Sequence, residues 1–263
     1  MRILKSESRR MSDFQNMIWS PDEYSQAAFL ARDASDEMLS RLELMAIKPA
    51  VIVDVGCGTG ELAAALALRY QDAKVYAVDV SAAMLAQAGA GRVICLQEDA
   101  GKLSFADQSV DLLCANFLLP WVADAKVCLR EWRRVLTPNG LLMVSVLGIS
   151  TLETIQGLLP AGALPGLIDM HDLGDALVTA GFADPVIDSS KISVNYRDKL
   201  RMQQELQTSG LLHQGVALPD IALQINFEIV HGHAFAPLPT AAFQADEQGA
   251  VRIPLSHLRK SLA

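Results

Sequence analysis

The segment DVGCGTG (54–60) is the feature that most narrows what this chain can fold into. Its three alternating glycines come directly after an apolar run (50–55) and directly before a helix-forming run (61–70). Glycine permits tight turns and lets a ligand approach the backbone closely. A strand, a glycine loop and a helix in this order indicate a βα unit whose loop binds a cofactor.

Apolar, β-rich runs alternate with helical patterns over the first 150 residues. This alternation is typical of βαβ units and predicts an α/β fold with a parallel sheet covered on both faces. The pattern predicts strands at 50–55, 74–80, 92–96, 110–116 and 140–147, and helices at 61–70, 81–89 and 124–136.

The second half of the chain has a less regular pattern. Two helices (169–182 and 196–212) and a short strand (183–188) are expected there. The run 226–235 alternates apolar and polar residues, so we expect a strand that pairs antiparallel at or near a sheet edge.

Composition excludes several classes of protein. The chain is 51% hydrophobic and 20% charged, as expected for a compact globular protein. A net charge of −8 argues against sequence-independent binding of nucleic acids. The N-terminus is polar and no apolar run reaches the roughly 18 residues of a spanning helix, so we expect a cytoplasmic protein without membrane contact. The cysteines and histidines lack metal-ligand spacing, so no metal site is expected.

The glycine loop favours one kind of cofactor over another. Its G-x-G-x-G spacing differs from the G-x-G-x-x-G that places a pyrophosphate on a helix N-terminus, and Asp54 would repel that dianion. The same carboxylate would attract the ammonium and sulfonium of S-adenosylmethionine. The alternative is a strand-to-helix turn whose glycines are incidental.

Two further acidic residues lie at or just after the ends of predicted strands. Asp79 lies nineteen residues after Gly60, where an acidic residue accepts hydrogen bonds from ribose hydroxyls; the alternative is a helix-capping role before Ser81. Asp99 and Ala100 follow the third strand, where a carboxylate and a backbone N–H suit an adenine ring. A solvated loop is the alternative there.

The segment NFLLPW (116–121) follows the fourth strand, at the sheet edge where α/β proteins bind ligands. We expect it to form a wall of the site, although simple packing of Phe117 and Trp121 would also explain the aromatic residues.

Several of these segments resemble a known class of proteins. DVGCGTG, Asp79, EDA (98–100) and RVLTPNG (134–140) resemble the class I S-adenosylmethionine-dependent methyltransferases over about residues 48–148. The segments 27–45, 151–155, 168–188, 195–196 and 228–235 resemble the malonyl-acyl-carrier-protein O-methyltransferases of biotin synthesis.

The resemblance implies a Rossmann-like fold with a mostly parallel seven-stranded sheet and an antiparallel last strand. It also implies a helical N-terminal cap (1–46), a methyltransferase domain (47–240) with lid insertions near 150–170 and 190–225, and a C-terminal tail (241–263). The implied cofactor ligands are Asp54, Gly56, Cys57, Gly58, Gly60, Asp79, Val80, Asp99, Ala100, Asn116 and Phe117.

The implied reaction is methyl transfer from S-adenosylmethionine, which becomes S-adenosylhomocysteine, to the free carboxylate of a malonyl group on acyl carrier protein. A carboxylate is already ionised at neutral pH, so no catalytic base is expected and no catalytic residue is assigned. The acidic carrier would dock on a basic cluster near the lid, made of Lys191, Arg197, Lys199 and Arg201.

The chain departs from the family pattern at 18–26, 148–150 and 213–225. Two alternatives therefore stay open. One is a protein-arginine hydroxylase of the complex I assembly type, which shares the DLG, AGF and NY pattern. The other is a diverged protein that binds S-adenosylmethionine without turnover.

Overall fold

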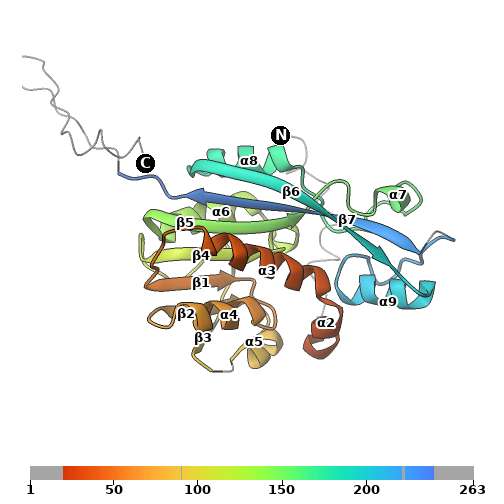
Figure 1. Cartoon of the computed structure of the whole chain (residues 1–263), viewed down its shortest axis with the longest axis horizontal. Coiled ribbons are helices and arrows are strands. Elements are labelled where there is room, and N and C mark those ends of the chain that lie inside the picture. The colour runs from red at the N-terminus through yellow and green to blue at the C-terminus, as the bar shows by residue number, and fades with distance from the viewer. Residues whose placement is uncertain (1–19, 90, 221–222, 240–263) are drawn as a thin grey trace, which may run out of the picture.

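The protein is described by a computed structural model, which defines residues 20–89, 91–220 and 223–239. These residues form a seven-stranded sheet with strand order β3-β2-β1-β4-β5-β7-β6. The strands β3, β2, β1, β4 and β5 run parallel, and β7 pairs antiparallel with both β5 and β6 (Figure 1). The predicted α/β class and the antiparallel last strand are confirmed.

The strands alternate with helices along the chain. The strands are β1 (Val51–Val55), β2 (Lys74–Asp79), β3 (Val93–Gln97), β4 (Val110–Asn116), β5 (Leu136–Leu147), β6 (Ala183–Asn195) and β7 (Gln224–Phe235). The helices are α2 (Pro21–Ala27), α3 (Phe29–Glu43), α4 (Glu61–Arg69), α5 (Ala82–Ala88), α6 (Ala125–Val135), α7 (Glu153–Gln156), α8 (Met170–Thr179) and α9 (Lys199–Thr208), with a short 3₁₀ turn at Leu119–Trp121.

Side chains that alternate along the central strands build two cores, one on each face of the sheet. On one face, Met38 of α3 and Leu66 of α4 pack with Ile52 of β1. On the other face, Trp132 of α6 and Leu177 of α8 pack with a second set of strand residues. Figure 1 shows α3 crossing the near face of the sheet, with α6 and α8 behind it. The near-continuous hydrophobicity of these strands follows from burial on both faces.

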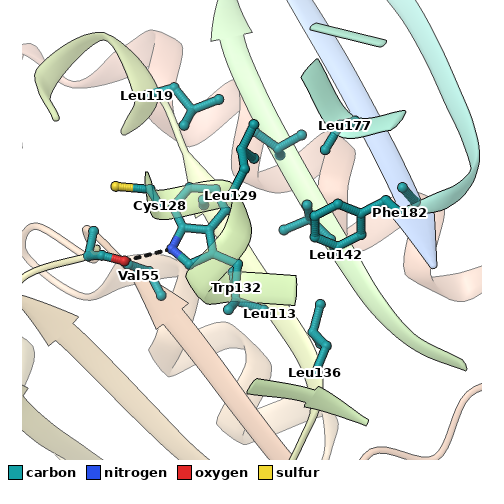
Figure 2. Close-up of a cluster of buried hydrophobic side chains, with 14 of the residues drawn as sticks. Val55, Leu113, Leu119, Cys128, Leu129, Trp132, Leu136, Leu142, Leu177 and Phe182 are labelled. Atoms are coloured by element: carbon teal, nitrogen blue, oxygen red, sulfur yellow. Dashed lines mark hydrogen bonds between the residues drawn. The ribbon is translucent and has the colours of Figure 1, made fainter. Parts of the chain in front are cut away.

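Trp132 forms the centre of the second core (Figure 2). Its side chain is fully buried, and its indole N–H donates a hydrogen bond of 3.0 Å to the carbonyl of Ala100. A buried indole N–H needs such a partner. The bond therefore connects α6 to the loop that follows β3.

A third cluster of buried side chains lies at the end of the sheet where α9 and α2 meet. It joins Leu30 and Ala34 of α3 to Met202 and Leu206 of α9 and to Phe227 of β7. This cluster brings the N-terminal helices against segments from the last third of the chain, and Figure 1 shows α2 beside α9.

Three predicted boundaries are wrong. The strand predicted at 183–188 continues to Asn195, because β6 pairs with β7 along its full length and its polar outer residues carry no apolar signal. The helix predicted at 196–212 spans only Lys199–Thr208, because Asp198 caps its start and Gly210 adopts a left-handed φ of 76° just after its end.

The third wrong boundary concerns β5, which begins at Leu136 instead of residue 140. Leu136 already pairs with Val110, and the N–H of Asn139 donates to the carbonyl of Ala236. Residues 137–140, whose sequence is typical of a turn, are therefore part of β5. The predicted tail (241–263) and the first nineteen residues of the predicted cap lie outside the described residues.

Within the described residues, no helix is both long enough and apolar enough to cross a membrane.

Candidate functional site

A cavity of about 400 Å³ opens at the carboxyl ends of β1, β2 and β4. It lies where the strand order reverses between β1 and β4, the position at which open α/β sheets bind ligands. The segments that follow these three strands contribute Gly56, Gly58, Asp79, Val80, Asn116 and Phe117 to its walls. A smaller hollow adjoins it and is lined in part by Asp54, Cys57 and Glu61.

The glycine loop is held tightly against the sheet. The N–H groups of Gly56 and Cys57 both donate to the carbonyl of Val78, at 2.7 and 3.1 Å. Gly56 has a φ of 68°, and a Cβ there would lie 2.6 Å from the Leu118 side chain. Gly60 has a φ of 81°, and a Cβ there would lie 2.7 Å from the Cα of Ala88. These two positions require glycine both for backbone conformation and for space.

Asp54 provides the strongest electrostatic feature of the site. Its side chain is 1% exposed, and its Oδ2 atom has no hydrogen-bond partner among the described residues. Burial raises the pKa of Asp54 to about 7, with nearby Asp79 adding to the effect and a backbone hydrogen bond from Ala63 opposing it. A buried carboxylate oxygen without a partner is costly, so a cationic ligand in the adjoining hollow would stabilise it.

Asp79 lies across the loop from Asp54 and lines the main cavity. Its two carboxylate oxygens accept hydrogen bonds from the N–H of Gly58 (3.0 Å) and of Ser81 (2.9 Å). Burial raises its pKa, although these backbone bonds favour the ionised form. Each carboxylate oxygen can accept more than one hydrogen bond, so both the predicted ribose role and the alternative helix-start role agree with this geometry.

The structure does not bring Asp99 and Ala100 to the cavity wall. Asp99 is exposed, and its Oδ1 accepts a hydrogen bond of 2.7 Å from the N–H of Gly101. Ala100 is buried and its carbonyl is occupied by Trp132. Their predicted contact with adenine therefore stays a prediction. The cofactor contact predicted for Gly60 also stays a prediction, because Gly60 packs against Ala88 and does not line either cavity.

Val80 and the segment after β4 line the cavity as predicted. Val80 is 65% exposed and lines the cavity, so it offers an apolar surface to a ligand there. Phe117 adopts a φ of 54°, a strained conformation for a large residue. Trp121 also lines the cavity, in agreement with the predicted wall at 116–121.

Tyr24 of α2 is not among the residues predicted from the sequence, where it lies in a segment (18–26) that departs from the family pattern. Its ring carbon Cε1 lies 3.5 Å from where a Cβ of Gly58 would be, and the residue lines both the main cavity and the smaller hollow. Burial raises its pKa to about 12, with Glu61 and Asp79 adding to the shift. The tyrosine is therefore neutral and places a hydroxyl beside two carboxylates.

The wall opposite the glycine loop consists of side chains from four separate segments. Leu30, Leu147, Pro165, Leu211 and Ser209 form most of it. Among the described residues that line the two cavities, there is no Lys, Arg or His. This end of the cavity is suited to exclude water from a bound acyl group rather than to pair with a charge.

Together these features fit a nucleoside that carries a positive charge. A cation would stabilise the unpartnered Asp54 oxygen, glycine at position 58 leaves the space beside Tyr24 open, and Val80 offers an apolar surface to a flat ring. No group of three or more metal-ligating side chains occurs within the described part of the chain, where His231 and His233 lie on β7.

Comparisons with known proteins agree with this geometry. A model of the methyltransferase domain matches residues 53–144. The fold resembles that of YcgJ from Bacillus subtilis (TM-score 0.58, 15% identity, 78% of this chain and 99% of that chain). It also resembles a possible histamine N-methyltransferase from Thermotoga maritima (TM-score 0.56, 18% identity, 87% and 100%). The fold and the site therefore define a class I methyltransferase that uses S-adenosylmethionine.

Relatives with similar sequences identify the family to which this chain belongs within that class. The chain is 32% identical to the malonyl-acyl-carrier-protein O-methyltransferase of Methylovorus sp. (strain MP688), over 81% of this chain and 84% of the relative. It is 30% identical to the enzyme of the same name from Halorhodospira halophila, over 92% of each chain. The chain belongs to the malonyl-acyl-carrier-protein O-methyltransferase family.

Proposed function

We propose that this enzyme methylates the free carboxylate of a malonyl group carried on acyl carrier protein, as a step of biotin synthesis. The observation that carries the proposal is the alignment of relatives named for this reaction over 81% and 92% of the chain, which includes the segments that form the wall opposite the glycine loop. Their shared name favours methyl transfer over the arginine-hydroxylase alternative.

The proposed reaction requires the protein mainly to bind the two substrates and to orient them. When bound, S-adenosylmethionine supplies a methyl group on a cationic sulfur, which keeps the electron pair of the broken bond. The acceptor carboxylate is already ionised and forms the new C–O bond without losing a proton, so no general base is needed. We assign to Asp54 the pairing with the ammonium, to Asp79 the ribose, and to the apolar wall the desolvation of the carboxylate.

The residues that line the cavity support the assignment of desolvation to its apolar wall. Removing water from a carboxylate is costly unless a positive charge lies nearby. The lining side chains in the described residues supply no such charge, so the cationic sulfur itself is the partner that the carboxylate would meet. The energetic cost of burying the acceptor is then offset only when both substrates are in place.

The carrier protein is proposed to dock on the basic cluster of Lys191, Arg197, Lys199 and Arg201. Lys191, Arg197 and Arg201 are exposed, and Lys199 is half-buried. Two of the four lie on α9, and Ser209 and Leu211, just after this helix, line the cavity. Lys199 and Arg201 lie in the first turn of α9, so a carrier bound on the cluster would lie about 15 Å along the helix from these cavity residues.

The substrate assignment is tested with the purified enzyme, S-adenosylmethionine and malonyl carrier protein, malonyl-coenzyme A or free malonate. We expect methyl-ester formation, detected by mass spectrometry, with the highest kcat/KM for the malonyl carrier protein. Absence of ester with all three acceptors, from protein that still binds S-adenosylhomocysteine, would support the alternative of binding without turnover. Rescue of a biotin auxotroph that lacks this methyltransferase tests the pathway, and with it the proposed cytoplasmic location.

The docking site is tested by charge reversal. Replacing Lys199 and Arg201 together by Glu is expected to raise the KM for malonyl carrier protein about tenfold, and to leave the KM for malonyl-coenzyme A unchanged. The matched control is Arg130→Glu, an exposed change on α6. Equal effects on both acceptors, or an equal effect of the control, would place the docking surface elsewhere.

A further inference from the structure

Asn116 stands at the end of β4 with every hydrogen-bonding atom of its carboxamide engaged within the protein. Its Nδ2 donates to the carbonyl of Ala31 (2.7 Å) and to the Oγ of Ser35 (2.9 Å), both on α3. Its Oδ1 accepts a hydrogen bond of 2.5 Å from the Oγ of Ser145 on β5. Both amide hydrogens are thus used, and neither is left for a cofactor.

The partners of Asn116 are themselves buried and connected. Ser145 is fully buried, and its carbonyl and Oγ both accept from the N–H of Phe117, at 3.1 and 3.2 Å. Ser35 is 9% exposed and donates to the carbonyl of Ala31 as well. The carboxamide therefore joins three elements, α3, the end of β4 and β5, at the point where Phe117 adopts its left-handed conformation. Buried polar networks of this kind are rigid when every member has a partner.

The helix held by this network carries one wall of the cavity. Leu30 and Ala31 of α3 line the cavity, as do Ala27 and Ala28 at the corner between α2 and α3. Two hydrogen bonds connect α2 to this corner and to α3: the N–H of Ala28 donates to the carbonyl of Tyr24, and Nη1 of Arg32 donates to the carbonyl of Ser25. A displacement of α3 at Ala31 would therefore move Tyr24 away from Gly58 and open the cofactor end of the cavity.

We propose that Asn116 is a positioning residue that sets the width of the cofactor cavity by fastening α3 to the sheet, and that its side chain acts through α3 and Tyr24 instead of contacting S-adenosylmethionine. This inference concerns the cofactor end of the cavity and holds whichever carboxylate is methylated. Failure of the malonyl assignment would leave it standing, since its readouts need no acceptor.

Two measurements on Asn116→Ala, Ser35→Ala and the double variant test the proposal. Hydrogen exchange of residues 21–43 in the cofactor-free protein reports how firmly α3 is held, and calorimetry with S-adenosylhomocysteine reports the cavity. For Asn116→Ala we expect hydrogen exchange of residues 21–43 to be about tenfold faster and the affinity for S-adenosylhomocysteine to be about tenfold lower. Ser35→Ala should shift both in the same direction by a smaller factor, and the double variant should match Asn116→Ala within about twofold, because both changes break one network.

Asn226→Ala is the matched control, since Asn226 is exposed on β7 and its Oδ1 accepts from Ser193 at 2.6 Å. It should change neither readout. If Asn116→Ala does not fold, Asn116→Asp keeps the shape and places an acceptor against the Ala31 carbonyl, and faster exchange is expected again. The proposal would be overturned in favour of direct contact if Asn116→Ala bound S-adenosylhomocysteine more weakly without faster hydrogen exchange and Ser35→Ala changed neither quantity. Unchanged exchange and unchanged affinity in all the variants would also overturn it.

Discussion

The two ends of the cavity are built in different ways. The glycine-loop end is centred on one short stretch of chain, which contains Asp54, Gly56 and Gly58 and is joined by Asp79 and Val80 from the end of the neighbouring strand β2. The opposite end collects Leu30, Pro165 and Leu211 from segments that are far apart in sequence. If the sequence-local end binds the cofactor and the dispersed end binds the acceptor, as proposed above, the acceptor end is able to change without altering cofactor binding.

The largest effect is expected from removing the charge of Asp54. Asp54→Asn should weaken binding of S-adenosylhomocysteine about 100-fold or more, because a buried charge pair loses one partner. Calorimetry measures the loss, and the melting temperature of the free protein should not fall, since burying a carboxylate is unfavourable.

Asp99→Asn serves as the contrasting variant for the same comparison. Asp99 is exposed and lies off the cavity wall, so its replacement should change affinity by less than about threefold. A loss as large as that of Asp54→Asn would show that the bound cofactor extends to the loop after β3.

The next effect in size is a pH dependence of cofactor affinity. The pKa of Asp54 lies at about 7 in the free protein, so the carboxylate is mostly protonated below this pH and mostly charged above it. The ammonium of S-adenosylhomocysteine pairs only with the charged form. Affinity should therefore be full above pH 7 and fall as the pH decreases, by up to about tenfold per unit. Titration calorimetry between pH 5.5 and 7.5 checks this prediction, and the profile should be flat in Asp54→Asn.

The close approach of the glycine loop predicts a loss of stability. Gly56→Ala forces a left-handed alanine and a contact with Leu118, and we expect about 2–3 kcal/mol lower free energy of unfolding. Gly91→Ala is the matched control, because Gly91 has a φ of 87° but nothing lies within 4 Å of a Cβ there. Gly91→Ala should lower the free energy of unfolding by only about 1 kcal/mol. Equal losses in denaturant titrations would mean that Leu118 moves aside freely.

The smallest effect is expected at the acceptor end. Ser209 is the polar side chain of that wall, and Ser209→Ala should raise the KM for malonyl carrier protein about threefold to fivefold, as expected for one hydrogen bond. Its hydroxyl donates to the Glu205 carbonyl in the free protein and would have to reorient to donate to the acceptor. The end of α9 should remain intact in the variant, because the N–H of Ser209 still donates to the same carbonyl. The affinity for S-adenosylhomocysteine should not change. Ser109→Ala, which removes a similar bond to the Ala106 carbonyl at an exposed position, should alter neither quantity.

The same contrast explains what was predictable from the sequence. The strand, glycine loop and helix at 50–70 could be predicted because the apolar run, the glycines and the helix pattern all lie in one window. Asp54 and Asp79 could be proposed because each lies one residue before the end of a predicted strand. Tyr24 could not, because its position depends on how α2 folds back over Gly58, and no local pattern encodes that contact. The length of β6 was missed for a similar reason, since its outer half is polar and is held by pairing with β7.

The ion pair at the far end of α3 has a consequence for how the molecule is assembled. The guanidinium of Arg41 donates from Nη1 and Nη2 to the two carboxylate oxygens of Asp188, at 2.6 and 2.7 Å, across a sequence separation of 147 residues. Such distant contacts form only after a long stretch of chain is available. During synthesis, this ion pair therefore forms only after β6 has left the ribosome. Until then α3 is held by its packing against β1 and α4 and by the hydrogen bonds of Asn116, so a chain truncated before Asp188 would keep α3 over the glycine loop but would hold its C-terminal end less firmly.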